Sequence, residues 1–449
     1  MGFRRLVGVI TAGVMVSAVA GCHGLLDVSD PTLVQDQDVA NASGAYARWL
    51  GAVANFEGQS ATLANDVALI SDERMVDIPG NFSLTSAFYL DRRNSEAYEA
   101  SVGMQDPHLN TWDQVLTTID VALPSVRAYA QADIKGDLLA LLFAAHGYAT
   151  LQLAEDMCPG FPLNGVTPDN LPILSGPLTT DSAIHLALTR ADSALADVHD
   201  STVYKYFAQV VKGRALLDLG QYADAAAAVT GVPVDFVYLS NHNTSGNFTP
   251  FYANGDDGWD LDGSNPDQHF AVGDTQGVNG LPFVSALDPR VPTKYERQRY
   301  LNPADSLYDQ LKYTDNFAPM VIASGVEAQL IVAEAAINAG DPNWFAILNT
   351  LRATAITPAM SPLTVMPSAM SDQIDLLYRE RAFWLYLTGR RLGDMRRLIR
   401  NYGRSAETVF PTGPYAIFGE AYGTATAIPF SLRAQGTFNP HITTGCTTR

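Results

Sequence analysis

Basic residues are scarce in this chain of 449 residues, which has 28 Lys and Arg against 47 Asp and Glu and a formal net charge of −19. An acidic surface repels phosphate backbones and anionic lipid headgroups, which excludes nucleic-acid binding through bulk charge. Charged residues are few overall, at 17%, while 47% of the residues are hydrophobic. This composition excludes intrinsic disorder and is sufficient for a large core.

Motifs of the common catalytic sites are also missing. The sequence contains no H-E-x-x-H, no G-x-S-x-G and no phosphate-binding glycine loop. The eight histidines are scattered, and no two have the spacing of metal ligands on a helix. A glycosidase needs two carboxylates at a set separation in space, and no pair stands out here. These absences favour a binding protein over a glycosidase-like enzyme.

Long apolar runs are confined to the first residues of the chain. Arg4 and Arg5 precede an apolar stretch over 6–20 that is too short to span a bilayer. The stretch ends in VAGC at Cys22, which resembles a bacterial lipobox. We expect 1–21 to be a lipoprotein signal peptide, Cys22 to carry the lipid and 22–37 to be a polar tether. An ordinary secretory signal or an anchor helix is the alternative. No later run of 18 residues is both uncharged and apolar enough to serve as a transmembrane helix, so we expect membrane contact through the lipid only.

Cysteine is rare, with three residues in the whole chain. If Cys22 is lipidated, Cys158 and Cys446 remain, and they allow a single pairing. Outside the cytoplasm a disulfide between them is favoured. The alternative is two buried free thiols.

Apolar residues recur at helical spacing over much of the chain. The clearest stretch is 204–232, where small residues alternate with Leu and Tyr, Gly220 interrupts the run and Pro233 closes it. This pattern predicts a helix, a tight turn and an antiparallel helix, as in a tetratricopeptide unit. One such unit cannot bury its own face, so neighbouring helical pairs are its expected stacking partners. Further helices are expected over 111–130, 133–157, 181–197, 323–339, 344–354 and 371–402.

The period disappears over 233–301, where Asn, Gly, Asp and aromatic residues dominate. A long aperiodic segment within a compact protein commonly marks a functional insertion. Sugars present apolar faces and hydroxyl groups, which aromatic rings and neighbouring polar side chains complement. The candidate ligand-binding residues are Phe251, Tyr252, Asn254, Trp259 and Asp260, with Asn247 nearby. The alternative is that these rings pack the loops onto the helical body.

The same insertion contains the acidic sequence GDDGWDLDGSNPD. Asp260 and Asp262 form part of a Ca²⁺-loop pattern, but no glutamate follows at the required distance. A solvated acidic turn is therefore the favoured interpretation over a Ca²⁺ site, and we expect no cofactor.

Several segments resemble the SusD/RagB family of outer-membrane nutrient-uptake lipoproteins over nearly the whole chain. The matching pieces are LLDVSDP after Cys22, EAQLIVAEAAINAGD with LNTLRA, YRERAFWLYLTGRRLGDMRR, the pair Phe410-Pro411, and Ile428-Pro429 before Asn439-Pro440. The RER…W…GRR…D.RR segment is the most specific of these. The acidic residue usual between the terminal Ile-Pro and Asn-Pro pairs is absent here.

The resemblance implies an all-α, mainly helical fold in which four tetratricopeptide-like pairs scaffold a long, irregular, loop-rich ligand-binding face. It implies a SusD-like N-terminal region over 38–232 and a RagB/SusD C-terminal region over 302–449. Relatives build their sites from irregular segments like 77–98, which adds Tyr89, Arg92 and Asn94 to the candidate residues.

The implied role is surface capture of glycans at the outer membrane and delivery to a TonB-dependent barrel. Some relatives bind peptides, so peptide uptake is one alternative. A lipid-anchored helical-repeat scaffold of an envelope assembly complex is another, and it would make the 233–301 insertion a protein interface.

Seven arginines lie within 22 residues, at positions 379, 381, 390, 391, 396, 397 and 400. An anion clamp is one interpretation of this cluster. The favoured one is an internal network with Glu380, Asp394 and carboxylates from other helices, because the resemblance treats the segment as structural.

Overall fold

The computed structural model describes residues 39–77, 86–103, 105–167, 171–242, 269–299, 302–315, 317–415 and 419–446. Within these ranges the protein is mainly helical, which confirms the expected fold class. The helices are α2 (Ala42–Ile70), α3 (Ser86–Asp91), α4 (Ser95–Val102), α5 (Pro107–Tyr129), α6 (Lys135–Asp156), α7 (Thr180–Asp197), α8 (Thr202–Asp218), α9 (Tyr222–Ala228), α10 (Gly325–Asn338), α11 (Asn343–Thr354), α12 (Met370–Trp384), α13 (Arg391–Tyr402), α14 (Ala406–Val409) and α15 (Leu432–Phe438).

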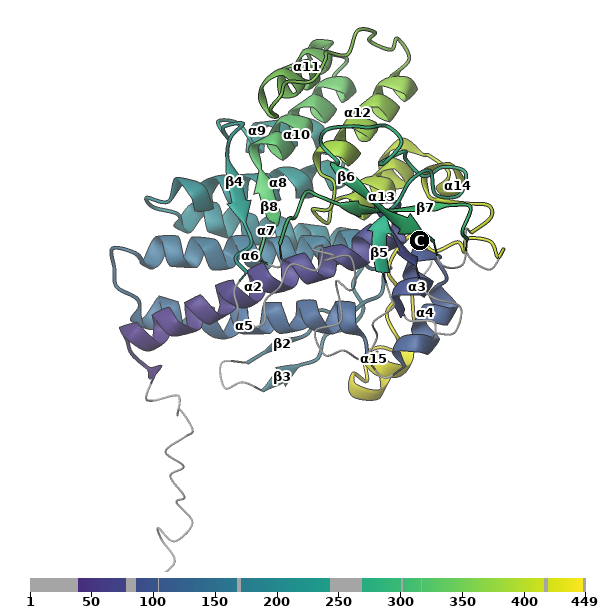
Figure 1. The fold of residues 1–449 in the computed structure, drawn as a ribbon. Helices are drawn as coiled ribbons and strands as arrows, with labels where there is room; N and C mark the ends of the chain where they lie inside the picture. Colours follow the sequence, from purple (N-terminus) through teal and green to yellow (C-terminus); the bar gives the residue numbers. More distant parts are fainter. Residues whose placement is uncertain are drawn as a thin grey trace, which may run out of the picture.

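Neighbouring helices stack into a layered scaffold. The pairs α2 with α5, α6 with α7, α7 with α8, α8 with α9 and α10 with α11 pack side by side. Figure 1 shows this stack rising from α5 through α6, α7 and α8 to α10 and α11. Each pair covers the apolar face of the next, as the tetratricopeptide pattern requires.

The hairpin expected over 204–232 is confirmed as α8 and α9. The turn between them places Gly220 at φ +71°, a conformation that glycine adopts without strain. Gly213 lies where the helices approach closely, because a Cβ there would be 2.6 Å from a methyl carbon of Val229. The small residues therefore set the helix spacing.

Helix α6 is the centre of the core. Every residue from Leu138 to Asp156 is buried. It is the one helix in the described ranges that is long and apolar enough to cross a membrane, but its apolar window is almost entirely covered by other parts of this protein. Packing against α5, α7 and α8 explains its composition.

The stretch over 371–402 differs from expectation, because it forms two helices rather than one. Between α12 and α13 the chain turns at Leu387 and Gly389, which have φ of +51° and +74°. The amide N–H of Leu387 donates to the buried carboxylate of Glu73 at 3.0 Å, which fixes the turn. The turn directs the arginines of α13 back into the core.

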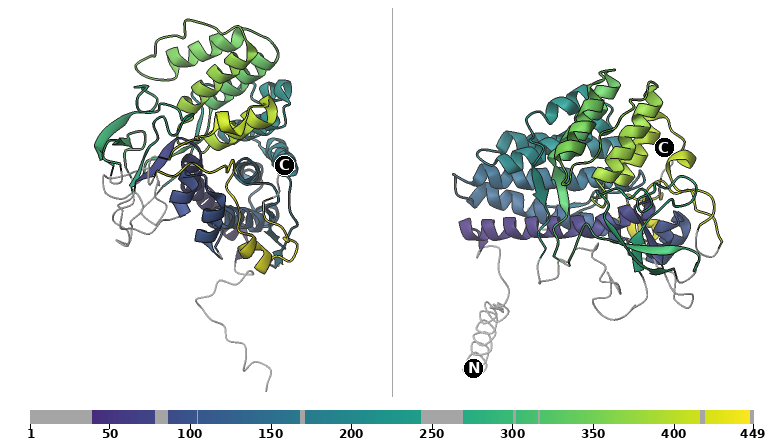
Figure 2. Two further views of the ribbon diagram at one scale, coloured as in Figure 1. Left: turned by 90° about the vertical axis from the view of Figure 1, so that its right-hand side faces the viewer. Right: turned by 45° about the horizontal axis from the view of Figure 1, so that its top comes forward.

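The described residues form four two-stranded antiparallel sheets: β1 (Arg74–Asp77) with β5 (His269–Val272), β2 (Gly165–Val166) with β3 (Pro172–Ile173), β4 (Val237–Leu239) with β8 (Val321–Ser324), and β6 (Thr293–Gln298) with β7 (Ser306–Gln310). Three of these sheets pair a strand of the 233–301 insertion with a strand outside it. Figure 2 shows the green β6–β7 hairpin at the edge of the helical stack in its left view, and Figure 1 shows β2 and β3 apart from it, below α5.

The C-terminal segment returns to the helical body. Cys158 and Cys446 form a disulfide across 288 residues, with their Cα atoms 5.4 Å apart, which is the pairing favoured from the sequence. Next to it, the amide of Cys158 donates to the carbonyl of Ile428 at 3.1 Å, and the amide of Ile428 donates to Asp156 at 2.8 Å. The segment after α14 is thereby attached to the end of α6.

Candidate ligand-binding site

The sheet of β1 and β5 brings distant segments to one place. In its antiparallel register Asp77 lies opposite His269, so residue 77 and residue 269 share one end of the sheet. The hairpin of β6 and β7 packs against β5. Met75, Ala271 and Leu307 form a small apolar cluster of their own between them. The predicted insertion and the early irregular segment are therefore neighbours at this sheet.

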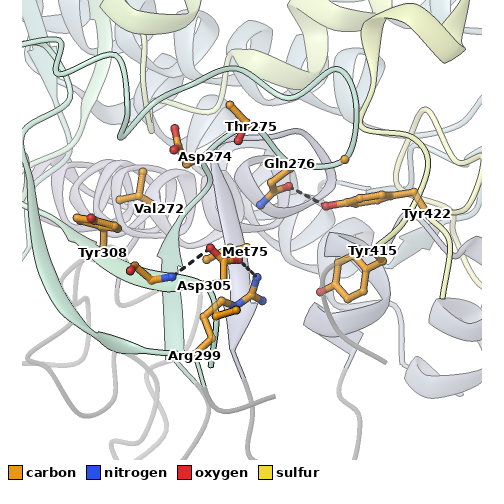
Figure 3. A pocket seen from close by; sticks show the side chains of 13 residues that line it. Met75, Val272, Asp274, Thr275, Gln276, Arg299, Asp305, Tyr308, Tyr415 and Tyr422 are labelled. Carbon is orange, nitrogen blue, oxygen red and sulfur yellow. Dashed lines mark hydrogen bonds and ion pairs between the residues drawn. The ribbon is translucent and has the colours of Figure 1, made fainter. Parts of the chain in front are cut away.

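A cavity of about 370 Å³ opens beside this sheet, and we call it the tyrosine pocket. Figure 3 shows its side chains converging from β1, β5, the hairpin and the C-terminal segment. The lining residues are Met75, Val272, Asp274, Thr275, Gln276, Gly277, Arg299, Ala304, Asp305, Ser306, Tyr308, Tyr415 and Tyr422.

Two aromatic walls shape the tyrosine pocket. Tyr415 and Tyr422 meet edge to face, with ring centroids 5.1 Å apart and planes at 87°. Tyr308 is half-buried in β7 and meets Tyr295 edge to face at 5.8 Å. Tyrosine combines a flat apolar face with a polar tip, so these rings suit a ligand with both kinds of surface.

The polar side chains of the pocket are held in place by the backbone. Gln276 donates from Nε2 to the carbonyl of Arg74 at 3.1 Å and accepts from the Tyr422 hydroxyl at 3.4 Å. Arg299 donates from Nη2 to the carbonyl of Val76 at 3.2 Å and pairs with Asp305 at 3.3 Å. Both side chains are nearly buried, so the pocket offers preformed hydrogen-bonding groups.

Behind the pocket, Tyr415 contacts a buried carboxyl. Its hydroxyl donates to Oδ2 of Asp91 at 2.6 Å, and the amide of Val76 donates to the same oxygen at 2.8 Å. Burial raises the pKa of Asp91 to about 7, although these two hydrogen bonds lower it. Strand β1 and Tyr415 are thereby held together.

A second cavity of about 440 Å³ lies between α2 and the start of α5. We call it the α2 pocket. Its walls include Asn65, Asp66, Tyr98 and Phe270. Arg74 connects it to the tyrosine pocket, because its guanidinium donates to Asn65 at 2.6 Å and to the carbonyl of Phe270 at 2.8 Å, while its own carbonyl accepts from Gln276.

His108 is buried beneath the α2 pocket between two carboxylates. Nδ1 lies 3.0 Å from Asp66 and Nε2 lies 3.2 Å from Asp156. Burial alone would lower the pKa of His108, but the hydrogen bonds and charges of Asp156 and Asp66 outweigh it and raise the pKa to about 9. The imidazolium therefore joins α2, α5 and α6.

The arginine segment forms the internal network favoured from the sequence. Arg381 makes two hydrogen bonds to Asp394, at 2.8 and 2.7 Å, and Arg397 pairs with Glu334 at 3.0 Å. Other buried partners are Glu327 for Arg390, Asp72 for Arg391, three backbone carbonyls for Arg396 and Asp218 for Arg400. Glu380 differs from expectation, because it pairs with Arg290 and Arg352 from outside the segment.

Most of the sequence-predicted ligand residues lie outside the described residues. These are Phe251, Tyr252, Asn254, Trp259 and Asp260, together with Asn247, the Ca²⁺ candidate Asp262 and the lipidation site Cys22. Their roles stay predictions.

Tyr89 lies in α3, and Arg92 and Asn94 lie at the turn from α3 to α4. None of the three lines either pocket. Tyr89 packs against Phe88, and Asn94 caps α4 by accepting from the amide of Ala97 at 3.0 Å. Arg92 forms an ion pair with Glu420, and its carbonyl accepts from the amide of Gly423 at 2.8 Å. This turn therefore holds the segment that carries Tyr422.

Sequence reasoning missed the residues that do line the tyrosine pocket. The lining residues come from distant segments, since Met75 and Tyr422 are 347 positions apart. The polar and aromatic ones that were missed are Gln276, Arg299, Tyr308, Tyr415 and Tyr422. The aromatic content of 233–301 predicts a site in that segment, whereas the pairing of strands far apart in the sequence decides which side chains line the tyrosine pocket.

No protein-family model and no curated relative matches this chain. Its fold matches solved structures, among them a SusD superfamily protein from Bacteroides thetaiotaomicron with 16% identity and a TM-score of 0.64, covering 91% of this chain and 100% of that one. NanU from B. fragilis matches with 13% identity, a TM-score of 0.56 and coverage of 93% and 99%. A SusD-like carbohydrate binding protein from Bacteroides vulgatus matches with 14% identity, a TM-score of 0.55 and coverage of 80% and 83%.

Proposed function

We propose that this chain, which has the fold of the SusD superfamily, is a lipid-anchored glycan-binding protein of the outer membrane. In this role it captures oligo- or polysaccharides at the cell surface and passes them to a TonB-dependent transporter. Binding, rather than catalysis, is the activity that we infer, and one matching structure is of a carbohydrate binding protein.

The tyrosine pocket is the observation that supports this proposal most strongly. A sugar ring can stack its apolar C–H face on a tyrosine and direct its hydroxyls to neighbouring polar groups. Tyr308 and Tyr422 supply rings at the wall, and Gln276, Asp274 and Asp305 supply an amide and carboxylates. A volume of about 370 Å³ lies within the usual range for small-ligand sites.

Glycan binding by the purified, lipidated protein in detergent is the direct test. We expect Tyr308→Ala to weaken binding of a polysaccharide found in a screen by roughly tenfold, as stacking contacts of about 1–1.5 kcal/mol imply. Tyr129→Ala is the matched control, because Tyr129 is an exposed ring at the end of α5 that lines neither pocket. Equal losses in both variants, or no binding of any glycan, would overturn the proposal.

The transporter partner needs a separate experiment. We expect the full-length protein to co-purify from solubilised outer membranes with a heat-modifiable barrel in stoichiometric amount. Recovery of envelope-assembly proteins instead would favour the scaffold alternative. Binding of peptides without any glycan would reassign the cargo while keeping the uptake role.

A further inference from the structure

A third cavity, of about 250 Å³, lies between α12, α13, α14 and the loop that follows β5. We call it the arginine pocket, because Arg379, Arg391 and Arg404 all line it. Its other polar walls are Asn279, Asp375, Tyr378 and Thr408. It shares no residue with the tyrosine pocket.

Arg379 is the exception in the arginine segment. The other six arginines of that segment bind buried carboxylates or carbonyls, as described above. Arg379 is exposed, and within the described ranges it has no carboxylate partner. The Arg379 guanidinium lies over the Phe383 ring, with its central carbon 5.0 Å from the ring centroid. Stacking on the ring orients the guanidinium and leaves its N–H groups available.

The charges around the arginine pocket do not balance. Arg391 is neutralised by two hydrogen bonds to Asp72, at 2.7 and 2.9 Å. Arg404 pairs with Asp375 at 2.6 Å and donates to the carbonyl of Ser371 at 2.8 Å. Glu380 follows Arg379 in the chain but is buried against Arg290 and Arg352. One positive charge is therefore left over in a protein with a net charge of −19.

We propose that the arginine pocket binds an oxyanion, either a carboxylate or sulfate group carried by a sugar or a free inorganic anion, between Arg379 and Arg404. Guanidinium groups match such anions in geometry and charge. The Arg404 side chain is 29% exposed, so a ligand reaches it as well as Arg379. This site stands independently of the glycan role proposed for the tyrosine pocket.

Calorimetric titration of the full-length protein in nonionic detergent tests this site. The probes are sulfate, phosphate and D-glucuronate at constant ionic strength, and D-glucose is the uncharged control. We expect saturable binding of at least one anion. Arg379→Gln should weaken the affinity for that anion by roughly tenfold or more, and Arg404→Gln should also weaken it. Arg379→Lys keeps the charge and should lose less affinity than Arg379→Gln.

Lys205→Gln is the matched control for charge, because Lys205 is an exposed cation near the start of α8 that lines none of the three pockets. It should bind the anions as the unmodified protein does. Tighter binding of D-glucuronate than of the inorganic ions would identify a sugar-borne acid as the ligand, and the reverse order a free anion.

The proposal is overturned if none of the three anions binds saturably, or if Arg379→Gln binds them as well as Lys205→Gln does. Tyr308→Ala should leave anion binding unchanged. A failure of glycan binding at the tyrosine pocket is therefore distinguishable from a failure of this site.

Discussion

The hydroxyl of Tyr415 donates a 2.6 Å hydrogen bond to the buried carboxyl of Asp91, across 324 positions of the sequence. This contact ties the C-terminal segment to the helix that follows the first strand. Since Tyr415 also lines the tyrosine pocket, the same residue shapes the site and stabilises the fold around it.

Tyr415→Phe should destabilise the protein by about 1–3 kcal/mol at pH 8, because it removes a hydrogen bond to a buried carboxylate. At pH 5 the loss should be smaller, since Asp91 is then protonated in the folded state. Urea unfolding at the two pH values measures the difference. Tyr129→Phe, at an exposed ring, should change neither value. An identical loss at both pH values would contradict the assigned charge of Asp91.

Asp91→Asn should change how stability depends on pH. Burial raises the folded-state pKa of Asp91 from 3.8 to about 7, so between these values the folded state binds one more proton than the unfolded state. Stability then falls by up to about 1.4 kcal/mol per pH unit as pH rises through this window. The variant should lack that contribution between pH 4 and 7. A slope unchanged from the parent protein would show that Asp91 does not titrate there.

His108→Gln should change the stability of the protein over a different pH range. The pKa of His108 is raised from 6.5 to about 9, against the effect of burial, by Asp156 and Asp66. Its contribution to stability is present in full below pH 6.5 and is lost as pH rises through 9. The variant should be less stable than the parent at pH 6, and the gap should narrow at pH 9. A gap that is constant across this range would refute the charged imidazole.

Cys446→Ser should lower the free energy of unfolding by about 2–5 kcal/mol, because the disulfide with Cys158 closes a very long loop of the unfolded chain. Reductant should destabilise the parent by a similar amount and leave the variant unchanged. Thiol labelling of the unreduced, unfolded parent should find both cysteines blocked. Free reaction of both would contradict the bond.

Trp259→Ala tests the sequence-predicted part of the site, which lies outside the described residues. The expected result is weaker glycan binding with an unchanged unfolding transition, because the aromatic insertion is expected to contribute a stacking platform. Unchanged affinity would remove Trp259 from the site.

Local pattern was sufficient to predict the scaffold. The α8–α9 hairpin follows from small residues and Gly220 within 30 positions, and each of these signals concerns neighbours along one helix. The internal role of the arginines was also predicted, because the family resemblance treats that segment as structural. The identities of the carboxylate partners were not predictable, because Glu334, Asp72 and Asp218 come from other parts of the fold.

The types of side chain at the candidate site were predictable from the sequence, but the residues that line it were not. Its aromatic and polar composition is visible over 233–301, yet Tyr415, Tyr422 and Met75 lie far outside that segment. Pairing of β1 with β5 joins residues nearly 200 positions apart, and no periodicity in either strand encodes the partner. The break between α12 and α13 was missed because the helical spacing of apolar residues continues through Gly389. The positive φ of Gly389 becomes necessary only because the chain turns there to bring the arginines of α13 into the core.

The pairing of β1 with β5, and of Asp91 with Tyr415, also has a consequence for biogenesis. A chain emerging from the ribosome can form its α2–α9 helices early, since their contacts are close in sequence. The pocket needs residues 415 and 422, so it exists only after almost the whole polypeptide has been delivered. C-terminally truncated products that end before Tyr415 would therefore lack two of the three tyrosines that line this pocket.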